Sequence, residues 1–258
     1  VGCNTIYVKC KEEHLTTEQL SSIKDAIRRK LIGTEVVTES SNELILQILL
    51  GYPRLSVQDA IRRMFIIASS MFRDAVSALK NLDKDLARNV IETDDEVNRF
   101  DLYTVRLLKV ALQDTRLIKE VGLKTITESL GYRLVTKSLE RVADHAVRIA
   151  ENVLAINEPI PDSLYQKILE YSSIGNKLLE DSLTALFKED YYAADRVSSE
   201  LEEIVAMEEG LLEMILSRKL DAKTISHLRL ILESSKRISE YSEDIAEVTL
   251  NRTVEKLK

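Results

Sequence analysis

The sequence predicts a mainly α-helical protein: two tandem three-helix bundles preceded by a small βαββ segment. Gly and Pro are rare, 7 and 3 in 258 residues, and the interval from Arg54 to Val121 contains neither. A mostly β protein would not sustain such an interval. Apolar residues recur there at steps of three and four, which is the spacing of one helix face. Related segments also recur in the same order in the two halves of the helical part, which indicates a tandem repeat.

The first 54 residues, 1–54, predict the small βαββ segment. TIYVKC reads as a short strand, and TEQLSSIKDAIRRKLIG reads as a helix closed by Gly33. TEVVTESSNELILQIL then alternates like a hairpin that turns at Ser40 to Asn42. Because the chain begins with Val1 and Thr5 opens a strand almost at once, we expect the natural polypeptide to start further upstream.

The rest of the chain predicts six long helices. Ser56 and Asp59 form a capping box ahead of the first helix. A second helix should follow Asp83, and the stretch SLERVADHAVRIAENV lies in the third. EPIP then breaks the chain before three more helices. We therefore place the first bundle at residues 55–158 and the second at residues 159–258.

The internal repeat supports this division. DAVSALKNLDKDLARNV, residues 74–90, matches DSLTALFKEDYYAADRV, residues 181–197. LERVADHAVRIAE, residues 139–151, matches SKRISEYSEDIAE, residues 235–247. We read the matches as two three-helix units, each with its own apolar seam.

Composition narrows the class of protein. The formal charge is −7 with a pI near 5.3, which argues against nucleic-acid binding by this chain alone. The sequence has no secretory signal, and no apolar run approaches the roughly 20 residues of a membrane-spanning helix. Cys3 and Cys10 are the only cysteines, too few for a disulfide framework, so we expect a cytoplasmic protein.

Two acidic residues stand out in the third predicted helix. Its apolar seam comprises Val135, Leu139, Val142, Ala146, Ile149 and Val153. At about 100° per residue, Glu140 and Asp144 project to the opposite side, one above the other. The sequence therefore predicts that both carboxylates are exposed.

The second predicted helix carries a matching set of oxygen ligands. Asp94, Asn98 and Asp101 follow one flank of its apolar stripe at i, i+4 and i+7. If the helix of Glu140 and Asp144 is the neighbour, four carboxylates converge, as in helical-bundle sites for hard or borderline cations. The alternative from spacing alone is that these acids pair with basic residues on exposed faces, since i,i+4 acids are common there. Those basic residues are Arg99, Lys137 and Arg141.

These residues together resemble a known family. MFRDAVSALKNLDKDLARNVIETDDEVNRFD, followed some forty residues later by LERVADHAVRIAENV, resembles the PhoU family of phosphate-uptake regulators, whose members carry a tandem repeat of three-helix bundles. The resemblance covers about Ser56 to Arg252. The βαββ segment with LSVQDAIRRM is similar to archaeal PhoU-like proteins, which carry an AbrB/SpoVT-type DNA-binding domain further upstream. That domain is not in this chain.

The resemblance implies surface sites for multinuclear clusters of iron or other metals. The matching positions in the first repeat are Asp94, Asn98, Asp101, Glu140 and Asp144. Iron is the first candidate, and zinc and manganese stay open.

The second repeat departs from this pattern. Leu201 and Val205 replace Asp94 and Asn98, and Lys236 replaces Glu140, while Glu208 and Glu240 remain. A lysine ammonium amid two carboxylates takes the electrostatic place of a cation. We therefore expect one metal site, not two.

The resemblance also implies a non-enzymatic regulator of phosphate uptake. Such a homo-oligomeric protein would act through contacts with a phosphate ABC transporter or its sensor and would reach the membrane only through that partner. Two alternatives stay open: a transcriptional regulator, when joined to an upstream DNA-binding domain, and a carboxylate-bridged metal enzyme. Metal enzymes of bundle type usually hold their ions in the core with ExxH pairs.

We expect His145 to be a packing residue, and His227 shows no partner in the sequence pattern.

Overall fold

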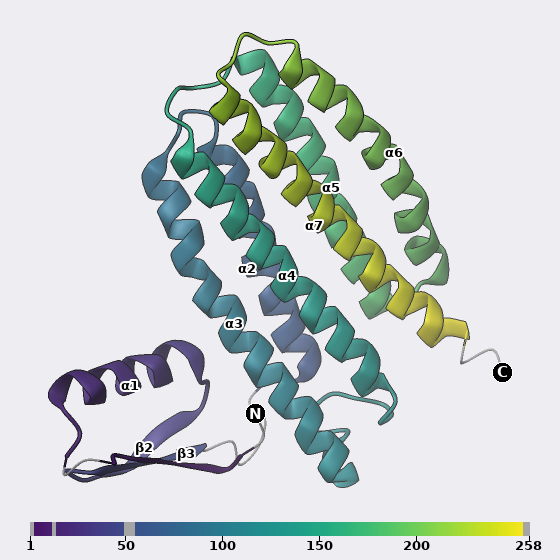
Figure 1. Ribbon diagram of the computed structural model, residues 1–258. Helices are drawn as coiled ribbons and strands as arrows, with labels where there is room; N and C mark the ends of the chain where they lie inside the picture. Colours follow the sequence, from purple (N-terminus) through teal and green to yellow (C-terminus); the bar gives the residue numbers. More distant parts are fainter. Residues whose placement is uncertain (1–2, 12–13, 49–54, 255–258) are drawn as a thin grey trace. The chain divides into compact units, whose positions relative to one another are not determined.

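The computed structural model describes residues 3–11, 14–48 and 55–254. The chain divides into two compact units: unit 1 comprises Val1–Arg63 and Asp95–Ser129, and unit 2 comprises Met64–Asp94 and Leu130–Lys258. Figure 1 shows the elements of both units and labels the helices α1 to α7 and the strands β2 and β3. One small sheet near the N-terminus and six long helices confirm the predicted fold class.

The N-terminal part of unit 1 is a βαββ segment. Its elements are β1 (Thr5–Lys9), α1 (Thr17–Lys30), β2 (Thr34–Glu39) and β3 (Glu43–Ile48). The strands form an antiparallel sheet in the order β1-β3-β2. The predicted strand, helix and hairpin are therefore all confirmed, with the turn between Glu39 and Glu43 as expected.

One face of this sheet packs on α1. Ile27 of α1 and Leu44 and Leu46 of β3 form a small buried core. Thr16 caps α1 by accepting a hydrogen bond from the Gln19 amide. Such a short segment buries little apolar surface by itself, so its contacts with the rest of unit 1 matter for its stability.

The six long helices confirm the second part of the prediction. They are α2 (Val57–Ala78), α3 (Lys84–Gln113), α4 (Glu128–Ala155), α5 (Asp162–Lys188), α6 (Tyr191–Leu216) and α7 (Ala222–Val254). The Ser56 hydroxyl donates to Asp59 Oδ2 at 2.7 Å, and the Asp59 amide donates to Ser56 Oγ at 3.1 Å. Asp83 Oδ1 accepts a hydrogen bond from the Leu86 amide at 2.9 Å. The predicted helix starts therefore rest on side-chain caps.

The start of α2 is hydrogen-bonded to the segment between α3 and α4. The sequence pattern did not assign a structure to this segment. The segment contains a 3-10 helix, Thr115–Leu117. The Val57 amide donates to the Val121 carbonyl at 2.9 Å. Gly122 has φ +86, and a Cβ there would lie 2.7 Å from Ser56 Cβ. Only glycine fits this turn without strain or a clash.

In unit 2, α5, α6 and α7 pack on one another, and α4 runs antiparallel to α7. Near the start of α4, a Cβ on Gly131 would lie 2.8 Å from Val248 Cγ1. Near the end of α4, Asn152 Oδ1 lies 2.8 Å from His227 Nδ1. Antiparallel contacts at both ends therefore join the third helix of one repeat to the third helix of the other.

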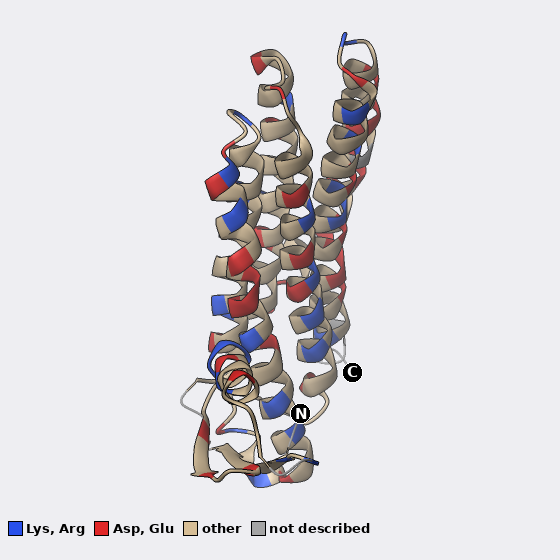
Figure 2. Ribbon diagram, turned by 60° about the vertical axis from the view of Figure 1, so that its left-hand side comes forward, with Lys and Arg blue, Asp and Glu red and all other residues tan. Residues whose placement is uncertain are grey.

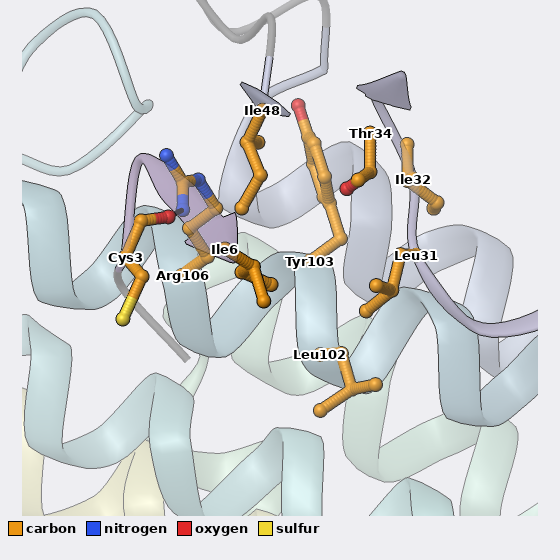
Figure 3. A pocket seen from close by; sticks show the side chains of 9 residues that line it. All are labelled: Cys3, Ile6, Leu31, Ile32, Thr34, Ile48, Leu102, Tyr103 and Arg106. Atoms are coloured by element: carbon orange, nitrogen blue, oxygen red, sulfur yellow. Dashed lines mark hydrogen bonds between the residues drawn. The ribbon is translucent and has the colours of Figure 1, made fainter. Parts of the chain in front are cut away.

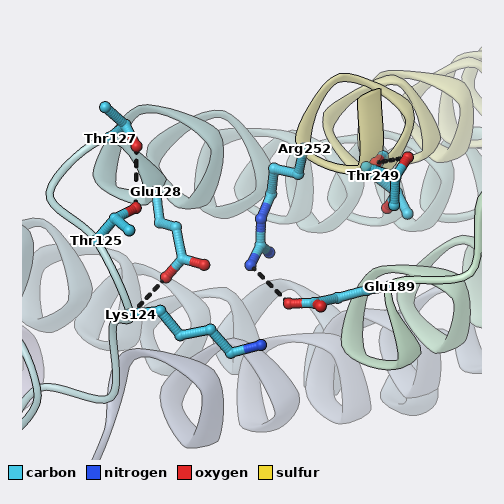
Figure 4. Close-up of polar contacts among 8 residues, drawn as sticks. Lys124, Thr125, Thr127, Glu128, Glu189, Thr249 and Arg252 are labelled. Atoms are coloured by element: carbon cyan, nitrogen blue, oxygen red, sulfur yellow. Dashed lines mark hydrogen bonds and ion pairs between the residues drawn. The ribbon is translucent and has the colours of Figure 1, made fainter. Parts of the chain in front are cut away.

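The C-terminal end of α7 is held by an arginine. Arg252 Nη2 lies 3.3 Å from Glu189 Oε1 at the end of α5 (Figure 4). The same guanidinium lies 4.9 Å from the centre of the Tyr132 ring of α4. One side chain thus connects α7 to α4 and to the end of α5. No helix in the described ranges is long and apolar enough to cross a membrane.

The buried seam of α4 lies where the sequence predicts it. Leu139, Val142, Ala146 and Ile149 are all fully buried in the core. Replacing Leu139 with Ala should lower the free energy of unfolding by about 2–5 kcal/mol, because it leaves a cavity that the neighbouring helices cannot close. Leu134→Ala is the matched control: Leu134 is 60% exposed on the same helix, and its loss should cost less than about 0.5 kcal/mol. Urea unfolding followed by circular dichroism measures both, and equal effects would contradict the packing described for α4.

Candidate metal centre

The two carboxylates of α4 lie at the edge of its buried face. The side chain of Glu140 is only 16% exposed and forms an ion pair with Lys137. Asp144 is half-buried. The prediction that both carboxylates are exposed is therefore wrong, because both side chains are partly buried. The buried face of α4 is wider than its apolar seam, since Ser138, Ala143 and His145 are buried as well.

Asp144 carries a charge that its surroundings do not fully offset. Burial raises the pKa of its carboxyl group, and the negative charge of Glu140 raises it further. Lys137, Arg148 and Arg141 act in the opposite direction and only reduce the shift in this pKa. A carboxylate in this situation favours a nearby cation, which fits an oxygen-liganded metal ion.

The α3 residues of the predicted site occupy a comparable edge. Asp94, Asn98 and Asp101 are each partly buried, next to the buried stripe that includes Val90 and Val97. This exposure agrees with the predicted flank position. The described part of the chain gathers no group of three or more His, Cys, Asp or Glu side chains that could hold a metal ion. The structure thus brings Glu140 and Asp144 together, and a complete metal site remains a prediction.

In the second repeat, the ammonium group of Lys236 lies at the position that corresponds to Glu140 of the first repeat. Lys236 Nζ lies 2.9 Å from Glu208 Oε2. The hydrogen bond to Glu208 raises the pKa of the Lys236 ammonium, and the charges of Glu208 and Glu240 add to the effect. Lys236 therefore occupies the position that the sequence predicted for it, between α6 and α7. These helices form a charged groove there, which Lys236, Glu208 and Glu240 line.

A buried tyrosine near this groove was not predicted. Tyr171 of α5 is 1% exposed, and its hydroxyl oxygen has no hydrogen-bond partner in the described structure. Burial raises the pKa of this hydroxyl, and the charges of Glu208 and Glu240 raise it further. The sequence pattern could not single out Tyr171, because this residue lies on the apolar face of its helix in the same way as any other core residue.

Two histidines, His145 and His227, lie at contacts between helices in the described part of the chain. The His145 ring is buried and its centre lies 5.7 Å from that of Tyr241. Burial lowers its pKa to about 4, with contributions from Arg148 and Arg237. The predicted burial of His145 against neighbouring side chains is confirmed, but its Nδ1 has no hydrogen-bond partner among the described residues. His227 does have a partner, Asn152; the contact joins α4 to α7 and is invisible to a local sequence pattern.

Comparison with known proteins gives the family. The model of the family described as PhoU domain matches residues 61–153 and 168–249. The chain belongs to the PhoU domain family. The two matched ranges correspond to the two repeats, so the sequence resemblance is confirmed.

Individual relatives and solved structures agree with this assignment. The chain is 26% identical over 185 residues to the phosphate-specific transport system accessory protein PhoU homolog 2 of Thermotoga maritima, covering 70% of this chain and 77% of the relative. It is 26% identical over 206 residues to the PhoU accessory protein of Escherichia coli, covering 74% of this chain and 80% of the relative. The crystal structure of PhoU from Pseudomonas aeruginosa matches with a TM-score of 0.65 at 19% identity, covering 78% of this chain and 96% of that one. The last comparison supports the PhoU fold.

The Lys236–Glu208 pair should stabilise the second PhoU repeat. Lys236→Met leaves the Glu208 carboxylate without its ammonium partner in a groove where its side chain is 23% exposed. We expect the free energy of unfolding to fall by about 1 kcal/mol. The matched control is Arg237→Met, which removes a 54% exposed arginine paired with Glu240 and should cost less than about 0.5 kcal/mol. Urea unfolding compares the two, and a larger loss for the Arg237 variant would contradict the assignment of Lys236 as the internal cation.

Proposed function

We propose that this chain is a cytoplasmic, non-enzymatic regulator of phosphate uptake. The observation that carries the proposal is the family match over both repeats. It is supported by relatives named as accessory proteins of the phosphate-specific transport system. The chain would act as a homo-oligomer, through contacts with a phosphate transporter or its sensor.

The surface offers a face for such a contact. Leu130 and Leu134 lie one turn apart on α4 and are 73% and 60% exposed. Exposed apolar side chains next to one another are typical of protein-protein contacts. In the view of Figure 2, acidic and basic residues both occur along the same helices. This distribution supports a protein partner over a nucleic acid, which selects for a continuous basic stripe.

Phosphate uptake in the source organism tests the proposal. Deleting the gene should alter the rate of labelled phosphate uptake and the starvation response, and the parent chain should restore both. Replacing Leu130 and Leu134 together with Glu should abolish this restoration, because charged side chains cannot enter an apolar contact. Leu216→Glu is the matched control, since Leu216 is 59% exposed at the end of α6, and it should restore both. Unchanged uptake and starvation response after deletion would contradict the proposed function.

We also propose a metal site on the first repeat, held by Asp94, Asn98 and Asp101 of α3 and by Glu140 and Asp144 of α4. The raised pKa of Asp144 supports it, because a nearby cation would relieve the cost of keeping this carboxylate charged beside Glu140. A bound iron, manganese or zinc ion would supply positive charge there and link the helices that carry its ligands. In the second repeat, Lys236 already supplies that charge.

Thermal stability should therefore respond to metal through the first repeat only. Adding Fe²⁺ or Mn²⁺ to metal-free protein should raise its melting temperature, because an ion that binds only the folded state stabilises it. Replacing Glu140 and Asp144 together with Ala should abolish the rise, whereas Glu240→Ala should leave it nearly unchanged. Thermal-shift titrations make the comparison. An equal loss of the metal-dependent rise in the two variants would contradict a single site. If metal does not raise the melting temperature of the parent, these acidic residues are ordinary polar residues of the helix surface and not metal ligands.

A further inference from the structure

Unit 1 contains a small cavity between the βαββ segment and α3 (Figure 3). Its volume is about 120 Å³. The lining residues are Cys3, Ile6, Leu31, Ile32, Thr34, Ile48, Leu102, Tyr103 and Arg106. Most of the wall is aliphatic, and one guanidinium lies in it.

That guanidinium belongs to Arg106, which is only 8% exposed. Its Nη1 donates to the Cys3 carbonyl at 2.7 Å, and its Nη2 donates to Asn4 Oδ1 at 3.0 Å. Both acceptors are neutral. Within residues 3–11, 14–48 and 55–254, no carboxylate forms an ion pair with Arg106. Burial accordingly lowers the pKa of this guanidinium.

These two hydrogen bonds have a structural role, because they attach the start of β1 to α3. They do not neutralise the charge, however, and they use two of the five N–H donors that a guanidinium carries. A buried charge without an opposite charge is costly. An open cavity beside it provides room for an anion that would remove this cost.

We propose that this cavity binds a small monocarboxylate with a short branched apolar body. The carboxylate would accept hydrogen bonds from the donors of Arg106 that the protein leaves unused. The apolar body would contact Ile6, Ile48 and Leu102. A cavity of about 150 Å³ accommodates benzene, so this slightly smaller one suits a ligand of similar or smaller size, such as isobutyrate. This proposal does not depend on the role in phosphate uptake.

The chemistry of the wall favours a carboxylate over inorganic phosphate. A phosphate dianion presents four oxygens and needs donors on several sides. The cavity offers one buried guanidinium and the hydroxyl of Thr34, while the hydroxyl of Tyr103 is already hydrogen-bonded to Leu55. These two groups lie in a mostly aliphatic wall, which stabilises a hydrocarbon body and leaves several of the four phosphate oxygens without partners.

Isothermal titration calorimetry of the full chain with isobutyrate tests the proposal. Isobutyrate should bind at least about ten-fold more tightly than isobutyramide, which has the same shape without the charge. It should also bind more tightly than inorganic phosphate. Absence of isobutyrate binding, equal binding of the amide, or tighter binding of phosphate would each overturn the proposal.

Variants locate the binding in this cavity. Arg106→Gln removes the charge and should weaken isobutyrate binding at least about ten-fold. Arg116→Gln, which changes an exposed arginine paired with Asp114, should bind as the parent does. Ile6→Phe keeps Arg106 and fills the cavity, so it should also lose binding. If circular dichroism shows that Arg106→Gln fails to fold, Ile6→Phe decides: unchanged isobutyrate affinity in that variant contradicts the site.

Discussion

Charge compensation at the edge of the helical core is the constraint on which this structure depends. Long amphipathic helices bury their apolar seams, and the acidic residues beside the seams lose part of their hydration. A carboxylate in that position requires a positive charge nearby. In the second repeat the requirement is met within the chain, since Lys236 lies 2.9 Å from Glu208. In the first repeat, Lys137 pairs with Glu140, and the pKa of Asp144 still stays raised.

The two repeats therefore differ in chemistry although they share a fold. Lys236 of α7 gives the second repeat its own positive charge, next to Glu208 of α6. The first repeat has acidic residues in the matching places, where we propose that a metal ion from solution supplies the positive charge. On this proposal, the stability of the second repeat is independent of metal ions, and the stability of the first repeat rises when a metal ion binds. Arg106 is a second buried charged group, and its charge is positive. We propose that a bound carboxylate ligand in the adjacent cavity neutralises it.

The fold could be predicted in detail because its determinants are local. The spacing of apolar residues, the Ser56–Asp59 capping box and the EPIP break each act within a few residues. The burial of Glu140 could not be predicted in this way, because the width of a buried helix face depends on how many neighbours pack on it. The contacts of His227 with Asn152 and of Arg106 with Cys3 join residues 75 and 103 positions apart. No periodicity reveals such contacts, so the Arg106 cavity was missed entirely.

Metal content measured by inductively coupled plasma mass spectrometry tests the central claim most directly. The protein would be purified without chelators and without nickel affinity resin, so that a bound ion is neither removed nor introduced. The account predicts stoichiometric iron, manganese or zinc in the parent chain and only trace metal when Glu140 and Asp144 are both replaced with Ala. Trace metal in the parent, or equal metal in parent and variant, would contradict the claim that the first repeat obtains its compensating charge from a bound ion.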